Sequence, residues 1–258
     1  MTRGRVELAP SVMCADFLHL ADTLRVFEAH RIEYLHVDIM DGHYVPNFTL
    51  GTRFCRVLGE GTAIPLDIHL MIENVDQYLP EFCARRGSMV SFHPEVVWHP
   101  LRTLQAIRAF GCKAGLSIDP AMTLDTVKPL LPETDFLCMM TVNPGYAGQP
   151  LVAGGLERIA EFRDFLDRNY PHIRLEVDGN VSWRNIPLMV ERGAEILVCG
   201  SSSLFDPAHP LAENIGRIRE IAAAPAPGGE FSPEITRRQR SGGVRSRCRS
   251  GADRVPGR

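Results

Sequence analysis

Four polar residues of types that bind metals and carry protons interrupt apolar segments of the sequence. His36 and Asp38 lie in one such segment, His69 in a second and Asp178 in a third. Because side chains alternate along a β-strand, His36 and Asp38 share one face. A single buried histidine or aspartate is most often a hydrogen-bonded core group, since burying it unpaired is costly. Four of them at the ends of three strands instead predict a metal site, and two imidazoles with two carboxylates suit Zn, Fe, Mn or Co better than Ca or Mg.

Segments rich in glycine and serine follow the last three apolar segments. Small residues let backbone N–H groups approach an anion closely, and barrels often bind phosphate in their last two loops. The run NPGYAGQ alone would indicate only a turn, but it is followed by two similar runs, and none of the three contains Lys or Arg. We therefore predict a phosphate site made mainly of backbone dipoles. Its predicted residues are Gly145, Tyr146, Ala147, Gly148, Gly179, Asn180, Gly200 and Ser201.

The elements that must position these residues repeat along residues 1–224. Eight apolar runs are predicted to be strands, and helix-like stretches separate them, least clearly between the second and third runs. This order predicts a single-domain α/β protein with a (β/α)8 TIM barrel, whose chemistry lies at the carboxyl ends of the strands. The predicted strands are 6–13, 33–40, 65–71, 89–93, 113–118, 136–142, 174–179 and 195–200, and the helices are 18–30, 74–86, 100–110, 121–131, 155–170, 184–192 and 210–223.

A doubly wound open sheet is the alternative fold. It normally carries a GxGxxG turn after its first strand, whereas the corresponding segment here reads PSVMCADF. Gly111 and Gly193 each follow a predicted helix, where a left-handed residue commonly ends the helix. The missing GxGxxG turn favours the barrel, and the two glycines support the predicted helix ends.

Composition is that of a globular protein without a membrane segment. The chain has 258 residues, of which 45% are hydrophobic and 23% charged, and no run reaches the roughly 18 uncharged apolar residues that a spanning helix needs. Seven scattered cysteines without a CxxC pair favour a reducing compartment. We therefore predict a cytoplasmic protein with no membrane partner.

Residues 225–258 differ from the rest of the chain. They contain eight arginines and three acidic residues, a formal charge of +5 that leaves −8 for residues 1–224. With almost no apolar residues and many Gly, Ser and Pro, this arginine-rich tail is predicted to be disordered. Such a tail can bind nucleic acid, but a solvated extension is the prediction here.

Six motifs follow one another along the chain: APSVM (9–13), HVDIMDGHYVPN (36–47), DIHLM (67–71), MTVNPGYAGQ (140–149), VDGN (177–180) and CGSSSLF (199–205). Together they resemble the ribulose-phosphate 3-epimerase family over nearly all of residues 6–222. The HVDIMDGHYVPN segment is highly specific, and the others occur with it in order. The resemblance implies a metal-dependent 3-epimerase of a phosphorylated ketose on a (β/α)8 barrel, with a sugar phosphate as its small-molecule partner.

The resemblance also implies roles for individual residues. One divalent ion would be held by four ligands, and two of these would carry protons to and from opposite faces of C3 through an enediolate. The implied ligands are His36, Asp38, His69 and Asp178, the implied proton carriers are Asp38 and Asp178, and the implied substrate contacts are Ser11, Met40, His69, Met71 and Met140.

Two departures bear on the substrate. Typical ribulose-5-phosphate enzymes read GFGGQ where this chain has Gly145-Tyr146-Ala147-Gly148-Gln149, and VDGG where it has Asn180. With His93-Pro94-Glu95, Thr141 and Gln149-Pro150, these changes resemble the D-allulose-6-phosphate 3-epimerase branch. We therefore predict conversion of D-allulose 6-phosphate and D-fructose 6-phosphate, with D-ribulose 5-phosphate and D-xylulose 5-phosphate as the alternative.

Two other classes of protein were weighed. A phosphate-binding barrel that cleaves aldols would need a Schiff-base lysine or a different metal shell, and Lys113 begins its strand and so lies at the wrong mouth. An anion-binding module would depend on the arginine-rich tail, whereas an epimerase would keep its turnover when residues 225–258 are deleted. We also predict a homo-oligomer.

Overall fold

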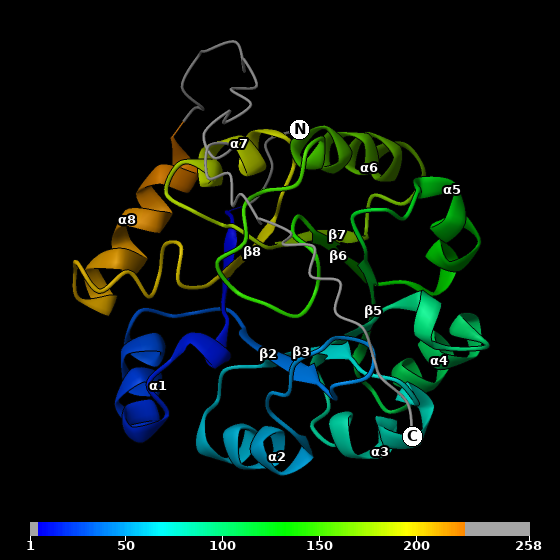
Figure 1. The fold of residues 1–258 in the computed structure, drawn as a ribbon, viewed down its shortest axis with the longest axis horizontal. Coiled ribbons are helices and arrows are strands. Elements are labelled where there is room, and N and C mark those ends of the chain that lie inside the picture. The colour runs from blue at the N-terminus through cyan, green and yellow to red at the C-terminus, as the bar shows by residue number, and fades with distance from the viewer. Residues whose placement is uncertain (1–4, 225–258) are drawn as a thin grey trace, which may run out of the picture. The chain divides into compact units, whose positions relative to one another are not determined.

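Eight parallel strands, numbered β1 to β8 in chain order, form the centre of the molecule, with the helices around them (Figure 1). This computed structural model describes residues 5–224, so the tail predicted at 225–258 lies outside the described residues. The strands are β1 Glu7–Pro10, β2 Leu35–Met40, β3 Leu66–Met71, β4 Met89–Phe92, β5 Lys113–Ile118, β6 Phe136–Met140, β7 Arg174–Asp178 and β8 Ile196–Cys199.

The sheet order is that of a barrel. Strands pair in the order β1-β8-β7-β6-β5-β4-β3-β2, and the remaining edge between β1 and β2 is joined by a parallel bridge from Ser11 to His36. The Tyr34 N–H also donates to the Leu8 carbonyl across this edge at 3.3 Å. The predicted (β/α)8 barrel is confirmed.

The helices follow the strands, with two departures from the sequence-based prediction. The link between β2 and β3 contains α2, although its Gly59 and Gly61 weaken helical propensity, because Cys55 and Leu58 pack into the core. The predicted helix 121–131 is a single turn, α5, followed by a 3-10 segment, since the prolines there cannot donate a helical hydrogen bond. The helices are α1 Leu20–Ala29, α2 Thr52–Gly61, α3 Val75–Phe82, α4 Pro100–Ala109, α5 Leu124–Val127, α6 Gly155–Asn169, α7 Asn185–Glu191 and α8 Leu211–Ala223.

Gly111 and Gly193 end α4 and α7 as predicted, with φ of 83° and 111°. No helix of residues 5–224 is long and apolar enough to cross a membrane.

Period-two alternation divides the side chains of each strand between two environments. On β2, Val37 and Ile39 belong to the large apolar cluster that also includes residues of the helices, whereas His36 and Asp38 belong to the opposite face. Phe136 belongs to a second apolar cluster, formed by residues of the strands. Its ring packs so closely on β5 that a Cβ at position 115 would lie 2.2 Å from it. Glycine at 115 is therefore required for this packing.

Candidate active site

Four side chains meet where β2, β3 and β7 end. The Nε2 atom of His36 lies 3.2 Å from Asp38 Oδ1 and 3.9 Å from Asp178 Oδ2. The Nδ1 atom of His69 lies 3.4 Å from Asp38 Oδ1 and 3.6 Å from Asp178 Oδ2. Strands β2 and β3 are neighbours while β7 lies across the barrel, so the two aspartates reach the cluster from different sides. The structure thus brings together the four residues predicted as ligands.

The distances between these ligand atoms, and the lack of a hydrogen-bond partner at one of them, fit a metal ion. A tetrahedral ion with bonds of about 2.1 Å separates its ligand atoms by about 3.4 Å, which is close to the distances in the cluster. One ligand atom from each of the four residues lies within 4.8 Å of the others. Within residues 5–224, the buried His69 Nδ1 has no hydrogen-bond partner, so this nitrogen is available as a ligand atom. The cluster could therefore hold one divalent cation.

A second group of buried acids lies against His36. Its Nδ1 atom is 2.5 Å from Asp67 Oδ2 and 3.8 Å from Glu176 Oε1, and both acids are fully buried. The carboxylate of Asp67 orients the ring so that Nε2 faces the cluster. Sequence analysis missed both acids, although the same alternation would have found them, because each precedes a predicted ligand by two residues.

His69 has a buried partner on the side of its ring away from the aspartates. Its Nε2 atom lies 3.0 Å from Nε2 of His93, which is fully buried. The Nδ1 atom of His93 lies 3.4 Å from Glu95 Oε1, and the Tyr44 hydroxyl donates to the same oxygen at 2.8 Å. Sequence analysis used His93 and Glu95 only as marks of substrate preference, and the structure places them beside a predicted ligand.

The two aspartates of the cluster differ in proton affinity. Burial raises the pKa of Asp178 to about 6, with Asp38 adding to the rise against the pull of His36. Burial also acts to raise the pKa of Asp38, but the charges of His36 and His69 and the hydrogen bond with His36 outweigh it and lower the pKa. The side chain of Asp38 is 6% exposed and that of Asp178 is 17% exposed. The two carboxyl groups therefore differ in proton affinity in the metal-free protein.

The pKa values of the buried groups that contact the cluster are shifted as well. Burial lowers the pKa of His36, but the charges of Asp38 and Asp67 raise it well above its ordinary value. Burial, followed by the charge of Asp67, raises the pKa of Glu176 well above its ordinary value. Burial lowers the pKa of His93 against the pull of Glu95.

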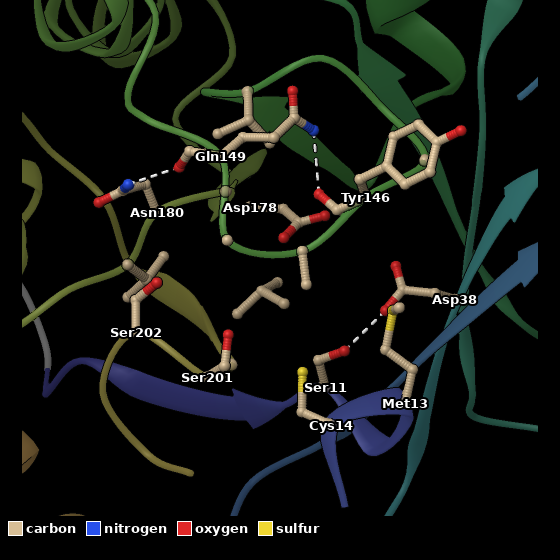
Figure 2. A pocket seen from close by; sticks show the side chains of 18 of the residues that line it. Ser11, Met13, Cys14, Asp38, Tyr146, Gln149, Asp178, Asn180, Ser201 and Ser202 are labelled. Carbon is tan, nitrogen blue, oxygen red and sulfur yellow. Dashed lines mark hydrogen bonds between the residues drawn. The ribbon is translucent and has the colours of Figure 1, made fainter. Parts of the chain in front are cut away.

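A pocket opens beside the cluster, and Asp38 and Asp178 both point into it (Figure 2). The Ser11 hydroxyl donates to Asp38 Oδ2 at 2.7 Å at its edge. His69, predicted as a substrate contact, lies behind the pocket and is not among its lining residues. The other predicted substrate contacts line it, namely Ser11, Met40, Met71 and Met140.

The glycine-rich loops after β6, β7 and β8 form the rest of the pocket wall. The Asn180 amide donates to the Gln149 carbonyl at 2.6 Å, and the Gln149 amide donates to the Tyr146 carbonyl at 2.9 Å. The Tyr146 hydroxyl donates to the Pro46 backbone carbonyl at 2.9 Å, so the Tyr146 ring turns away from the centre of the pocket (Figure 2). All eight residues predicted for phosphate binding line the pocket: Gly145, Tyr146, Ala147, Gly148, Gly179, Asn180, Gly200 and Ser201.

Sequence analysis missed other parts of this wall. Among the described residues, none that lines the pocket is Lys or Arg, so positive potential there must come from backbone N–H groups. Asn143 and Gln149 belong to the run NPGYAGQ and Ser202 to the serine run after β8, and all three line the pocket. The missed residues lie within three positions of predicted ones, and they are Met13, Cys14, Val142, Val181 and Val198.

A closed barrel with histidines, carboxylates and glycine-rich loops at its strand ends defines an enzyme of the (β/α)8 class. The model of the ribulose-phosphate 3 epimerase family matches residues 7–205. The chain belongs to this family, whose members are isomerases.

Curated relatives support this assignment over most of the chain. A ribulose-phosphate 3-epimerase of Serratia marcescens is 41% identical over 202 residues, covering 78% of this chain and 96% of the relative. The enzyme of the same name from Escherichia coli K12 is 40% identical over 200 residues, covering 77% and 88%. That of Bacillus subtilis is 36% identical over 198 residues, covering 76% and 91%.

Solved structures with low sequence identity share the fold alone. A thiamine phosphate pyrophosphorylase from Pyrococcus furiosus has a TM-score of 0.57 at 14% identity, covering 84% of this chain and 95% of that chain. A Mycobacterium tuberculosis tryptophan synthase has a TM-score of 0.59 at 12% identity, covering 84% and 93%.

Proposed function

We propose that this chain interconverts D-ribulose 5-phosphate and D-xylulose 5-phosphate by inverting C3, with one divalent metal ion at the strand ends. The observation that carries the proposal is that Asp38 and Asp178 face one pocket from separate strands and share a cluster with two histidines. The relatives named above are all ribulose-phosphate 3-epimerases. They favour the five-carbon alternative over the six-carbon substrate predicted from the loop sequences.

The two aspartates account for inversion. The C3 hydrogen lies next to a carbonyl group but is too weakly acidic to leave unaided near neutral pH. One carboxylate takes this proton from one face, an enediolate forms, and the other acid returns a proton to the opposite face. Asp38 on β2 and Asp178 on β7 can flank a substrate, which two neighbours on one strand cannot do. In the reverse reaction the two groups exchange roles.

Other groups of the site support this transfer. A bound divalent ion would stabilise the negative charge that develops on the oxygens at C2 and C3. The proposed ligands are His36, Asp38, His69 and Asp178, which are brought within reach of one ion. Ser11 donates to Asp38 Oδ2 and so holds that carboxylate at the pocket.

The methionines form an apolar wall. Met40, Met71 and Met140 line the pocket and are almost fully buried. Apolar and polarisable side chains exclude water from the reacting carbon, which strengthens the electrostatic interactions around it. We assign the phosphate to the loops after β6, β7 and β8, where Gly145 and Gly179 both have φ of 112° and leave the backbone uncovered.

Aspartate-to-asparagine variants test the proton path. Asp38→Asn and Asp178→Asn should each abolish epimerisation while a circular dichroism melt shows a folded barrel. Asp206→Asn is a matched control, because Asp206 lies outside the pocket, where its carboxylate accepts a hydrogen bond from the Trp183 N–H at 3.0 Å. Substantial turnover in both pocket variants would remove these residues from the proton path.

Metal content and substrate are tested separately. His36→Ala and His69→Ala should lower bound metal in elemental analysis, and unchanged stoichiometry would refute ligation. Turnover of ribulose 5-phosphate and allulose 6-phosphate should be compared on one purified sample. The proposal expects the larger kcat/KM for the pentulose, and the opposite order would support the six-carbon substrate.

Two predictions concern the state of the protein. We expect a homo-oligomer, which light scattering on the full chain can measure. We also keep the prediction of a cytoplasmic location, which suits the six free cysteines among residues 5–224.

A further inference from the structure

The two ring nitrogens of His69 lie in different surroundings. Nδ1 lies 3.4 Å from Asp38 Oδ1 and 3.6 Å from Asp178 Oδ2, in the proposed ion site. Nε2 lies 3.0 Å from Nε2 of His93, and the two ring centroids are 5.1 Å apart. Both imidazoles are fully buried. Within residues 5–224, their Nε2 atoms are therefore hydrogen-bond partners of each other, away from bulk water.

Two imidazole nitrogens at this distance form a hydrogen bond only if one carries hydrogen and the other does not. If His93 donates, His69 must carry its own hydrogen on Nδ1, and no lone pair faces the aspartates. If His69 donates from Nε2, its Nδ1 presents a lone pair to the cluster. Only the second arrangement prepares His69 to bind a cation.

Glu95 decides between the two arrangements. Its Oε1 lies 3.4 Å from His93 Nδ1, and a carboxylate can only accept. This contact lacks hydrogen-bond geometry, but the carboxylate charge beside Nδ1 favours the neutral His93 tautomer that carries hydrogen there. This tautomer leaves Nε2 as the acceptor for His69. The Tyr44 hydroxyl donates to the same Glu95 oxygen at 2.8 Å, and the Tyr44 ring packs on His93 at 4.8 Å. Glu95 is thereby held in place.

We propose that His93 is a positioning residue that keeps the Nδ1 lone pair of His69 turned toward the ion site, with Glu95 and Tyr44 setting the direction of its hydrogen bond. This role rests on the proposed metal-dependent function. The partners of metal-binding histidines typically change metal affinity by about 10- to 100-fold when removed. His93 thus plays for His69 the part that Asp67 plays for His36.

Nuclear magnetic resonance of the full chain with 15N-labelled histidine tests the direction of the bond. Long-range 1H–15N correlations distinguish imidazoles protonated on Nδ1 from those protonated on Nε2. In the metal-free wild type, His69 should carry hydrogen on Nε2 and His93 on Nδ1. The reverse pattern would overturn the proposal even if the protein binds metal.

Zn²⁺ titration against a chromophoric chelator tests the consequence. His93→Leu should weaken Zn²⁺ binding by about 10- to 100-fold, and Glu95→Gln should weaken it less, because an amide can still accept from His93. His99→Leu is the matched control, since His99 is an exposed histidine of the same β4–α4 connection.

The outcomes separate this inference from the proposed function. Glu95 is 34% exposed, so Glu95→Gln and the wild-type resonances decide the matter if His93→Leu does not fold. Wild-type affinity in His93→Leu, or the reverse tautomers in the wild type, would refute the positioning role while leaving the metal site intact. A wild-type chain that binds no Zn²⁺ would instead refute the proposed function.

Discussion

Replacing Asp67 with asparagine removes one negative charge from behind the metal-facing imidazole of His36 with almost no change in side-chain shape. Asp67 Oδ2 lies 2.5 Å from His36 Nδ1, and both residues are fully buried. The amide oxygen of asparagine can still accept from Nδ1, so the orientation of the ring should survive. The loss of charge is therefore the main effect of this substitution.

The magnitude follows from the difference between two kinds of hydrogen bond. A hydrogen bond to a charged group contributes about 1.5–3 kcal/mol, and a neutral one contributes about 0.5–1.5 kcal/mol. Asp67→Asn should thus reduce the support given to His36 by about 1–1.5 kcal/mol. Since 1.4 kcal/mol is about a factor of ten in a dissociation constant, Zn²⁺ should bind about tenfold more weakly.

Chelator competition with Zn²⁺ measures this change, and Glu176→Gln provides a matched control. Glu176 Oε1 lies 3.8 Å from the same His36 nitrogen, but burial and Asp67 raise the pKa of its carboxyl well above its ordinary value, which favours the neutral form. An amide at 176 mimics that neutral form and should change Zn²⁺ affinity less than Asp67→Asn does. Wild-type affinity in Asp67→Asn, or equal losses in both variants, would refute the reasoning.

Three further predictions concern stability. Burial and Asp67 raise the pKa of folded Glu176 above about 4.3, its value in an unfolded chain. Its contribution to stability is present below that pH and is lost as pH rises toward the folded pKa. Metal-free Glu176→Gln should therefore show a shallower fall in unfolding free energy than the wild type as pH rises above about 4.3. Gly179→Ala should lower the unfolding free energy by about 1–3 kcal/mol, because φ is 112° and the new Cβ would lie 2.6 Å from Val142 Cγ2. Gly216→Ala in α8 places its Cβ where nothing lies within 4 Å and should raise the unfolding free energy by about 0.5–1 kcal/mol. Thermal melts in which both variants shift the melting temperature in the same direction would contradict this. Zn²⁺ at about 100 times its dissociation constant should add about 2.7 kcal/mol of stability, and a melting temperature that a chelator leaves unmoved would argue against the ion site.

Much of the fold was predictable from local patterns. Each strand carries enough apolar residues to be recognised alone, because strands buried on both faces read as continuous apolar runs. Helix α2 was not recognised, since its glycines weaken the local signal and its stability comes from Cys55 and Leu58 in the core. Helix α5 was overextended, because the apolar residues around Pro129 and Pro132 resemble a helix that the prolines interrupt.

The candidate site was likewise predictable only in part. His36, Asp38, His69 and Asp178 were predictable, because parallel strands bring their carboxyl ends to one mouth of the barrel. The partner role of Asp67 was not, since it depends on register: His36 pairs with Asp67 across β2 and β3. No periodicity within one strand reveals which residue lies opposite on the next.

By itself, the amino-acid sequence determined the order of the elements, the faces of the strands and the types of group available for chemistry, because these depend on neighbours a few positions apart. Only the tertiary structure decided that His93 faces His69, that Glu95 and Tyr44 support it from separate loops, and that Asp178 reaches Asp38 from across the barrel. Closure of the barrel sets these distances, and closure depends on packing and register summed over all eight strands.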